Sequence, residues 1–200
     1  MDGIAWASSA MVAARTRLEI ATGNLANVST DGFRKAVARG TLNADGVQIE
    51  RKTSSESGAL RHTGQPFDLA ILGEGSFRVR APDGSVETTR DGSFSLDRRG
   101  RLCDREGRVL LGERSALRIP AGAVIDERGQ VVRNGIPVDR IALPADATVR
   151  SGFIECADVD AIGEMVTVLS AQRSFESAEK VVSAIDGTRQ KSANDVARLK

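Results

Sequence analysis

The sequence predicts an α+β protein in which paired, coiled-coil-like helices at the N- and C-termini flank an inserted all-β hairpin domain. Heptad-spaced apolar residues at both ends of the chain predict the helices. Short apolar runs separated by glycine-containing turns predict the β domain between them. We expect four segments: an N-terminal helix and turn at 1–33, a linker or extended segment at 34–57, the β domain at 58–150 and a C-terminal helix at 151–200.

The N-terminal helix carries an apolar seam that runs unbroken through four heptads. One position of the repeat holds Ile4, Met11, Leu18 and Leu25, and the other holds Ala7, Ala14, Ala21 and Val28. A second stripe with the same spacing is formed by Trp6, Ala13 and Ile20. Two apolar stripes exceed what one partner helix covers, so we expect this helix to have more than one neighbour.

The C-terminal helix carries a matching seam. One position holds Ala161, Val168, Phe175 and Val182, and the other holds Ala171, Ala178 and Ile185, with Ile162, Val166 and Leu169 as a flanking stripe. Helix-packing residues on this side are expected to be Met165, Val168, Phe175 and Val182. At a rise of about 1.5 Å per residue the helices would be about 40 and 50 Å long and could lie side by side. Beyond Ile185 the seam fails, so the tail is expected to fray.

The middle of the chain has a different texture. Residues 35–57 show weak periodicity and predict a linker with one strand, "VQIE". From residue 58 onward, turn signals recur every 8 to 12 residues or so, which is typical of a small β sandwich or partly closed barrel. The turn signals are Pro82-Asp83-Gly84, Asp91-Gly92, Arg99-Gly100, Glu106-Gly107, Arg128-Gly129 and Asn134-Gly135.

Composition argues against several classes of partner. The formal net charge is +1, from 28 basic and 27 acidic residues, so no overall field attracts nucleic acid or an anionic membrane. The N-terminal sequence lacks the basic region and continuous apolar run of a cleavable signal, so we expect none. We also expect no membrane span, because no apolar run is long enough. Cys103 and Cys156 are far apart and lack CxxC spacing, which disfavours a zinc site or a disulfide framework.

No catalytic, cofactor-binding or metal-binding residues are predicted. His62 is the single histidine and no nucleophile accompanies it. The run "GEGSF" at Gly73 to Phe77 lacks the Lys-Ser/Thr ending of a phosphate loop and is interpreted as a strand start with glycine corners. The arginines between Arg98 and Arg108 alternate with acidic residues, which favours a solvated hairpin over an acidic protein partner.

The stretch "NLANVSTDGF" at residues 24–33 follows the N-terminal helix. Asn27 can cap the helix in the left-handed region, Thr30-Asp31-Gly32 supplies a turn, and Phe33 anchors the exit. From local chemistry alone this is a helix-ending turn and nothing more.

The same stretch resembles the N-terminal signature of the bacterial flagellar rod and hook protein family. The residues that carry this resemblance are Asn24, Ala26, Asn27, Thr30, Gly32 and Phe33. "TGQPFDLAILGEGSFRV" resembles the segment that opens the β domain of the family, through Gly64, Pro66, Asp68, Gly73, Gly75 and Phe77. "TRDGSFSLDRRGRL" resembles its next hairpin, and residues 152–182 resemble its C-terminal helix, with Glu164-Met165 and Gln172 to Glu176.

The resemblance implies a structural subunit of the basal-body rod rather than an enzyme. Its helices would pack in the inner tube around an export channel and be unfolded before assembly. Implied partners are further copies, other rod and hook axial proteins, surrounding basal-body rings and the flagellar type III export apparatus. The implied location is the periplasm-spanning rod, reached without a cleavable signal.

Three features depart from the family pattern. Ser76 stands in place of a second aromatic residue, "CADVD" at residues 156–160 lacks the common Ser-Asn, and only the short "PADATVRS" precedes the last helix. They leave the proximal and distal rod open, with the proximal rod favoured by length. The main alternative is a freestanding binding or adaptor module, in which an intramolecular helical hairpin presents the β domain. An enzyme of unfamiliar type is the third and least favoured hypothesis.

Overall fold

The computed structural model describes residues 3–43, 46–144 and 147–198. The chain forms two compact units. We call the first the helical unit; it contains residues 1–28, 35–54 and 159–200. The second, the β unit, contains residues 29–34 and 55–158.

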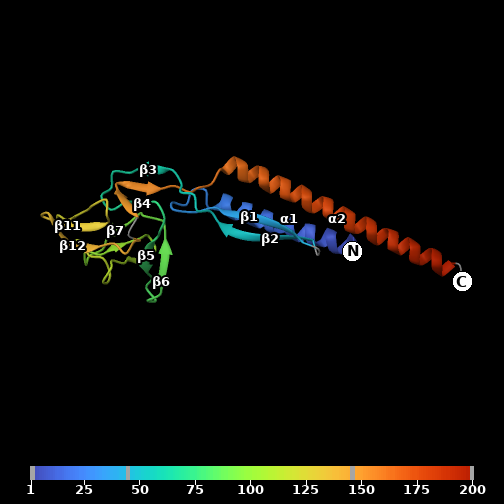
Figure 1. Cartoon of the computed structure of the whole chain (residues 1–200), viewed down its shortest axis with the longest axis horizontal. Helices are drawn as coiled ribbons and strands as arrows, with labels where there is room; N and C mark the ends of the chain where they lie inside the picture. The colour runs from blue at the N-terminus through green and yellow to red at the C-terminus, as the bar shows by residue number, and fades with distance from the viewer. Residues whose placement is uncertain (1–2, 44–45, 145–146, 199–200) are drawn as a thin grey trace. The chain divides into compact units, whose positions relative to one another are not determined.

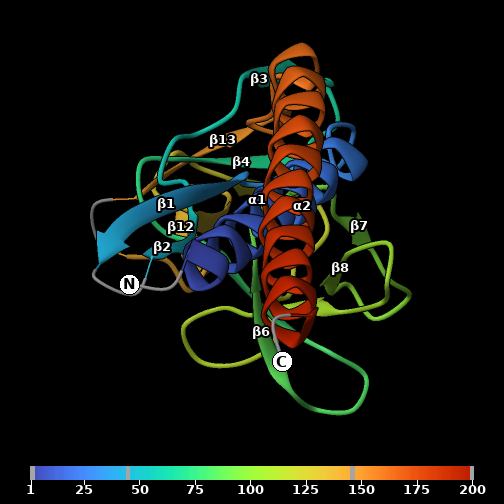
Figure 2. The ribbon, with the colours of Figure 1, turned by 90° about the vertical axis from the view of Figure 1, so that its right-hand side faces the viewer.

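Two helices dominate the helical unit. Helix α1 spans Gly3–Ala26 and helix α2 spans Ala161–Arg198, and they lie side by side (Figures 1 and 2). They run antiparallel, because Gly3 lies next to Ile185 while Asn24, near the other end of α1, bonds Glu164. With 24 and 38 residues, the helices are about 36 and 57 Å long. Helix α2 continues past Ile185 to Arg198, and fraying of this tail stays a prediction.

Burial along both helices follows the predicted seams except at Val28, which lies beyond the end of α1 and is exposed. On α1 the buried apolar residues are Ala7, Ala13, Ala14, Ile20 and Ala21. The positions on α2 that are buried or half-buried are Ala161, Gly163, Glu164, Val168, Ala171, Phe175, Ala178, Val182 and Ile185. Small alanine side chains at the centre of the contact allow the two helix backbones to approach closely.

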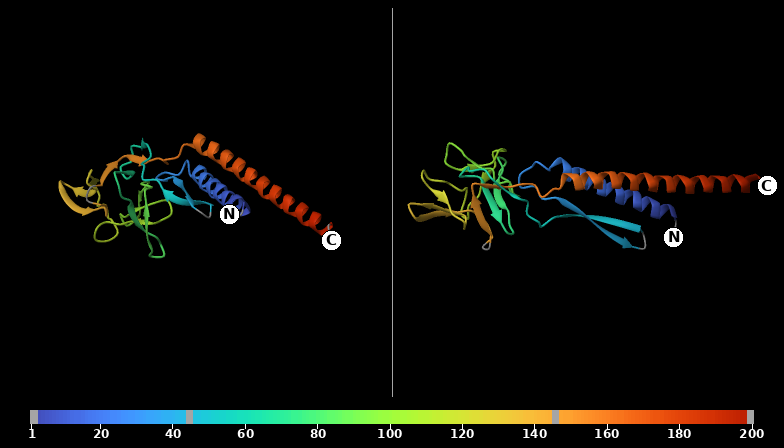
Figure 3. Two further views of the ribbon diagram at one scale, coloured as in Figure 1. Left: turned by 45° about the vertical axis from the view of Figure 1, so that its right-hand side comes forward. Right: turned by 90° about the horizontal axis from the view of Figure 1, so that it is seen from above.

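A β hairpin covers the other side of α1. Strand β1 (Ala36–Asn43) pairs antiparallel with β2 (Gly46–Thr53), with Ala36 opposite Thr53. Figure 3 shows α1 between this hairpin and α2. The sequence predicted a linker with one strand here, and the structure instead has two paired strands. The second stripe of α1 supplies the physical reason, because Ala13 and Ile20 require a cover that α2 does not provide.

In its described residues the β unit has twelve short strands, all paired antiparallel. They are β3 (Leu60–His62), β4 (Leu69–Leu72), β5 (Phe77–Arg80), β6 (Val86–Thr89), β7 (Ser95–Leu96), β8 (Leu102–Cys103), β9 (Val109–Leu110), β10 (Val124–Ile125), β11 (Gln130–Arg133), β12 (Ile136–Arg140), β13 (Thr148–Ser151) and β14 (Phe153–Glu155). The larger sheets have the orders β6-β5-β9-β8-β7 and β10-β11-β12, and the pairs β13-β4 and β14-β3 complete the unit.

Five of the six predicted turn signals connect adjacent paired strands. Their glycines have positive φ, as at Gly100 (71°), Gly107 (78°) and Gly129 (71°). In the turns that begin at Asp97, Asp104 and Asp126, the aspartate carboxylate accepts backbone N–H bonds from residues two and four positions later. The repeated D-x-x-G pattern therefore defines the hairpins. Asp91-Gly92 differs, because it links β6 and β7, which are not paired with each other.

One apolar core holds the β unit together. Phe77 is fully buried and meets the ring of Phe94 edge to face, with centroids 5.3 Å apart. The other buried members of this core are Leu69, Ile71, Val79, Leu102, Leu110, Leu117, Ile119, Ile125, Val131, Ile141, Ala147 and Val149. No strand contributes more than two of these side chains, so the core depends on contacts between segments far apart in the sequence.

The last two strands close the β unit. We call residues 148–155 the closing strap; it comprises β13, which pairs with β4, and β14, which pairs with β3. Gly152 separates the two strands at φ 81°, donates to the carbonyl of Asp68 and accepts from the amide of Thr63. The predicted C-terminal helical segment begins at residue 151, but its first residues belong to β13 and β14. Helix α2 begins only at Ala161.

Candidate functional site

The predicted helix-packing residues fall into two groups. Those half-buried along the contact between α1 and α2 are Ile4, Met11, Leu18, Leu25, Val168, Phe175 and Val182. Met165 differs, because it is 52% exposed. The seam thus brings the expected residues together within one chain, while Met165 belongs to a separate surface.

That surface is an uncovered apolar stripe, which we call the α2 stripe. Its members are Ile162, Met165, Val166 and Leu169, spaced as neighbours on one helix face. Their side chains are 52 to 75% exposed. Scattered exposed apolar residues are ordinary, but four adjacent ones on one helix face indicate a surface that packs against something.

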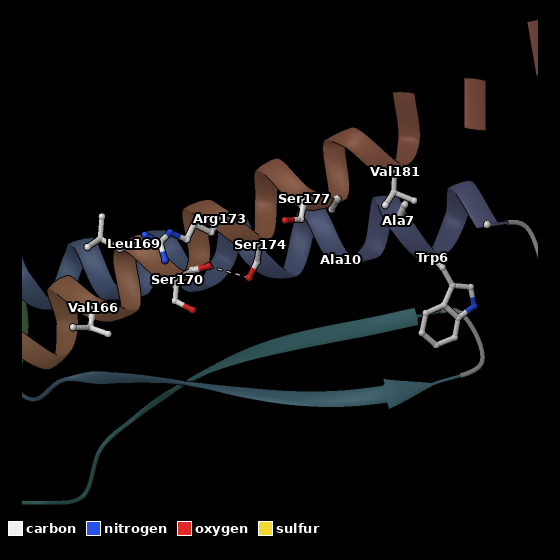
Figure 4. A pocket seen from close by; sticks show the side chains of 12 residues that line it. Trp6, Ala7, Ala10, Val166, Leu169, Ser170, Arg173, Ser174, Ser177 and Val181 are labelled. Carbon is white, nitrogen blue, oxygen red and sulfur yellow. Dashed lines mark hydrogen bonds between the residues drawn. The ribbon is translucent and has the colours of Figure 1, made fainter. Parts of the chain in front are cut away.

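A groove of about 800 Å³ follows the line where α1 and α2 meet (Figure 4). Val166 and Leu169 of the α2 stripe line it, and so do Ala7 and Ala10 of α1. Figure 4 shows the Trp6 ring lying beside the hairpin strands, and Arg173 is the charged residue of the lining. Small and apolar walls suit packing against another helix better than they suit chemistry.

Asn24 is a buried connector inside the helical unit. Its side-chain amide donates to the carbonyl of Ala36 (2.8 Å) and accepts from the amide of the same residue (2.8 Å). The amide nitrogen also donates to Glu164 Oε1 at 3.0 Å. Asn24 is 1% exposed, so it ties the start of β1 and the first turn of α2 to the end of α1 without access to water.

Asn27 ends α1 by a different route from the one predicted. Among the described non-glycine residues only Asn134 has a positive φ, so Asn27 is not in the left-handed region. Instead its side-chain Nδ2 donates to the carbonyl of Gly23 at 2.9 Å. This bond satisfies one of the carbonyls that a helix leaves free at its C-terminus.

The rest of the predicted signature belongs to the β unit. Gly32 has φ 71° and donates from its amide to the carbonyl of Glu155 at 2.7 Å. A Cβ atom at Gly32 would lie 2.3 Å from the backbone of both Arg90 and Asp91, so only glycine fits there. Phe33 closes a turn by donating to Thr30 and accepts from the amide of Asp158.

Next to this turn, Arg90 and Glu155 form a buried ion pair. Arg90 Nε is 3.0 Å from Glu155 Oε2, and the two side chains are 4% and 2% exposed. We call Arg90 and Glu155 the buried pair. Burial lowers the pKa of the Arg90 guanidinium from its ordinary value, and the charge of Glu155 opposes that effect. The carboxylate thus supplies the countercharge that a buried cation requires.

The segment that opens the β domain surrounds Arg90. Its guanidinium donates to the carbonyls of Gly73 (3.1 Å) and Gly75 (2.8 Å), and Phe77 then starts β5 in the core. These carbonyls face a cation, which is the opposite polarity to a phosphate loop and agrees with the predicted strand start. Of the other predicted residues, Asp68 is buried, while Gly64 and Pro66 are exposed in the loop before β4.

No arrangement suited to catalysis is found in the residues that the structure describes. His62 is exposed, and its ring meets that of Phe153 edge to face with centroids 4.8 Å apart. No three His, Cys, Asp or Glu side chains within the described ranges lie together in a way that could hold a metal ion. Over their described residues, neither α1 nor α2 has a stretch long and apolar enough to cross a membrane.

Sequence reasoning missed Arg90 and Glu155 as individual residues. Arg90 and Glu155 stand in blocks that resemble the family, but no spacing rule pairs positions so far apart. The available signal was a charged residue at the end of an apolar strand, "FIE" for Glu155. Such a residue is either solvated or paired, and only the fold decides between the two.

Three family models match the chain. They are described as flagella basal body rod protein (residues 4–34), flagellar hook protein FlgE/F/G D1 domain (residues 70–151) and flagellar basal body rod FlgEFG protein C-terminal (residues 150–196). The first and third cover α1 and α2, and the second covers most of the β unit. The β1–β2 hairpin lies outside all three matches.

Curated relatives agree with these models. The chain is 26% identical to the flagellar basal-body rod protein FlgG of Buchnera aphidicola subsp. Acyrthosiphon pisum, over 90% of this chain and 94% of the relative. It is 28% identical to the flagellar basal-body rod protein FlgF of Escherichia coli K12, over 84% and 87%. It is also 35% identical to the flagellar hook protein FlgE of Brucella abortus, over 72% of this chain and 38% of that protein.

Proposed function

The chain belongs to the flagellar basal-body rod and hook protein family and is a structural subunit of this kind, and on that premise we propose that it polymerises through its two terminal helices to form part of the rod. The assembled helices would enclose an export channel and transmit torque as a drive shaft. In this proposal the helices pair as a coiled coil within each subunit, and the β unit lies outside them.

The observation that carries this proposal is the α2 stripe. Covering its four side chains would remove apolar surface that the chain itself leaves in water. Full burial of a side chain of this size is worth about 1.5 to 3 kcal/mol, so four of them would support a contact repeated along a polymer. Its position beside the α1–α2 seam makes a helix of a neighbouring subunit a suitable cover.

Further parts of the proposal concern place and partners. We propose that the protein lies in the periplasm-spanning rod, contacts other rod and hook axial proteins and surrounding rings, and is delivered by the flagellar type III export apparatus. We also propose that it is not an enzyme. What supports these statements is the family and the printed names of the relatives.

The second candidate is a freestanding adaptor module with an intramolecular helical hairpin. One observation favours it: α1 and α2 pack against each other within a single chain, with Ala14 and Ala171 among the buried residues. In such a module both helices would be ordered at high dilution. In a rod subunit they would gain most of their order on assembly.

The test places charge on the two helix surfaces separately. Leu18→Glu and Phe175→Glu charge the seam, whereas Leu169→Glu charges the α2 stripe. We expect all three variants to lose motility and rod assembly while the β unit stays folded, as read from swimming halos and circular dichroism. Ser183→Glu, on an exposed polar position of α2, and His62→Ala are the controls and should swim normally.

Normal swimming of both seam variants would contradict polymerisation through the helices. If only Leu169→Glu swims normally, polymerisation through the seam is still supported, but the α2 stripe is not needed for it.

A further inference from the structure

The buried pair joins three segments of the β unit that are distant in sequence. Arg90 follows β6, Glu155 ends the closing strap, and Gly32 lies in the turn that precedes the helical unit's hairpin. All three meet at Glu155, which accepts a backbone hydrogen bond from Gly32 and faces Arg90. This convergence is not required by strand pairing, which β14 already achieves with β3.

Each oxygen of Glu155 contacts a different segment of the chain. Its backbone carbonyl accepts from Gly32, its Oε1 accepts from the amide of Gly58 at 3.2 Å, and its Oε2 lies against Arg90 Nε. A Cβ atom at Gly58 would lie 1.9 Å from the carbonyl oxygen of Cys156, so the chain also approaches the strap closely there. Without the strap, the amides of Gly32 and Gly58 would lose their acceptors and Arg90 would lose its counterion.

Arg90 also makes hydrogen bonds that do not involve Glu155. Its guanidinium already donates to Gly73, Gly75 and Ser57, all neutral oxygens from the segments around it. These bonds orient the cation but bring no negative charge. A buried cation without a counterion is strongly unfavourable, so a β unit that lacks Glu155 would have to expose Arg90 by opening the loop from Gly73 to Gly75.

We propose that the buried pair is a conformational latch, which makes the fold of the β unit conditional on seating of the closing strap and of the Gly32 turn. The strap brings Val149 and Ile154, 1% and 3% exposed, into the interior together with the carboxylate. Apolar burial and charge neutralisation therefore occur in one step. A chain that has not reached residue 155 presents no completed β unit for assembly.

The test is hydrogen exchange with mass spectrometry on the full-length chain. Glu155→Leu and Arg90→Met each remove one charge, and the double variant removes both while keeping apolar volume. We expect peptides from β4, β5 and β9 to exchange about 100-fold faster or more in each single variant, from the usual cost of breaking a buried pair. In the double variant, exchange should return to within about tenfold of the parent chain.

A matched control breaks an exposed pair in the same unit. Arg61 lies 2.8 Å from Asp31 with its side chain 55% exposed, so Arg61→Met should change exchange by less than about threefold. The latch is overturned if Glu155→Leu speeds exchange only around Gly32 and Gly58, or if the double variant is as poorly protected as the single variants. If a single variant fails to fold, the double variant decides. A folded double variant supports the latch, and an unfolded double variant refutes it.

Discussion

At the scale of single residues, the 24–33 signature has two separate roles. Asn24 and Asn27 complete the end of α1 through side-chain amides, one toward Ala36 and Glu164 and the other toward Gly23. Gly32 seats the following turn against Arg90 and Glu155. The density of polar residues in this stretch thus reflects its position at the border between the helical unit and the β unit.

Gly32→Ala is the sharpest residue-scale prediction. A left-handed alanine costs about 1 to 2 kcal/mol, and here the added Cβ would also overlap the backbone of Arg90. We expect the free energy of unfolding of the β unit to fall by about 3 kcal/mol or more, measured by urea denaturation. Gly107→Ala is the control, because Gly107 has φ 78° but no atom within 4 Å of the added Cβ.

Equal losses in these two variants would contradict this account. They would mean that the left-handed conformation alone, and not the close approach of Arg90, requires glycine at position 32.

At the scale of elements, the arrangement around α1 follows from its two apolar stripes. One stripe packs on α2, and the side of α1 that carries Ser9 and Asn24 meets the β1–β2 hairpin. Ser9 Oγ accepts from the amide of Val47 at 3.3 Å, which leaves no room for a side chain at Gly46. Helix α1, with two apolar faces, therefore packs against two elements, and its sequence predicts more than one neighbour.

The β7–β8 hairpin gives a prediction about pH. Asp97 accepts bonds from the backbone amides of Arg101 and Arg99 and from the Arg101 side chain. The largest cause is the backbone bond from Arg101, and together these bonds lower the pKa of Asp97 from 3.8 to about 2. A lowered carboxyl pKa stabilises the fold above the ordinary value, and this contribution is lost as pH falls from about 4 to about 2.

Asp97→Asn should remove that part of the pH dependence. We expect the variant to be less stable than the parent at neutral pH, with the gap in urea midpoint closing as pH approaches about 2. Glu127→Gln, which removes an exposed carboxylate in the β10–β11 turn, is the control and should change neither the stability at neutral pH nor its pH dependence. A gap between parent and Asp97→Asn that stays constant across this range would refute the assignment.

At the scale of the whole molecule, the compact β unit extends beyond the β domain that the sequence analysis expects. The sequence placed the β domain at 58–150, whereas the compact unit includes residues 29–34 and 55–158. Limited proteolysis of the dilute monomer tests this boundary. If the helices await a polymer, we expect a resistant fragment of residues 55–158, identified by mass spectrometry, and a β-rich circular dichroism spectrum.

Two other outcomes are informative. A fragment that ends near Arg150 would show that the closing strap is not part of the stable unit, against the latch. A resistant full-length chain with a strong helical signal would instead favour the freestanding module.

The sequence by itself determined the local features of this protein. Heptad spacing predicts which residues of α1 and α2 lose exposure, and aspartate-glycine turns predict where strands reverse, because both depend on residues close together in the chain. The blocks that resemble the rod and hook family are likewise local, and the family models match the same regions.

Only the tertiary structure decided the contacts between distant segments. Nothing near Arg90 in the sequence indicates that Glu155 neutralises it, and nothing in residues 35–57 shows that α1 will cover a hairpin made from them. Met165 illustrates the same limit, since it is predicted for packing but lies exposed on the α2 stripe. Burial of a charge or of an apolar face is settled by what the folded chain brings against it, and that information is not local.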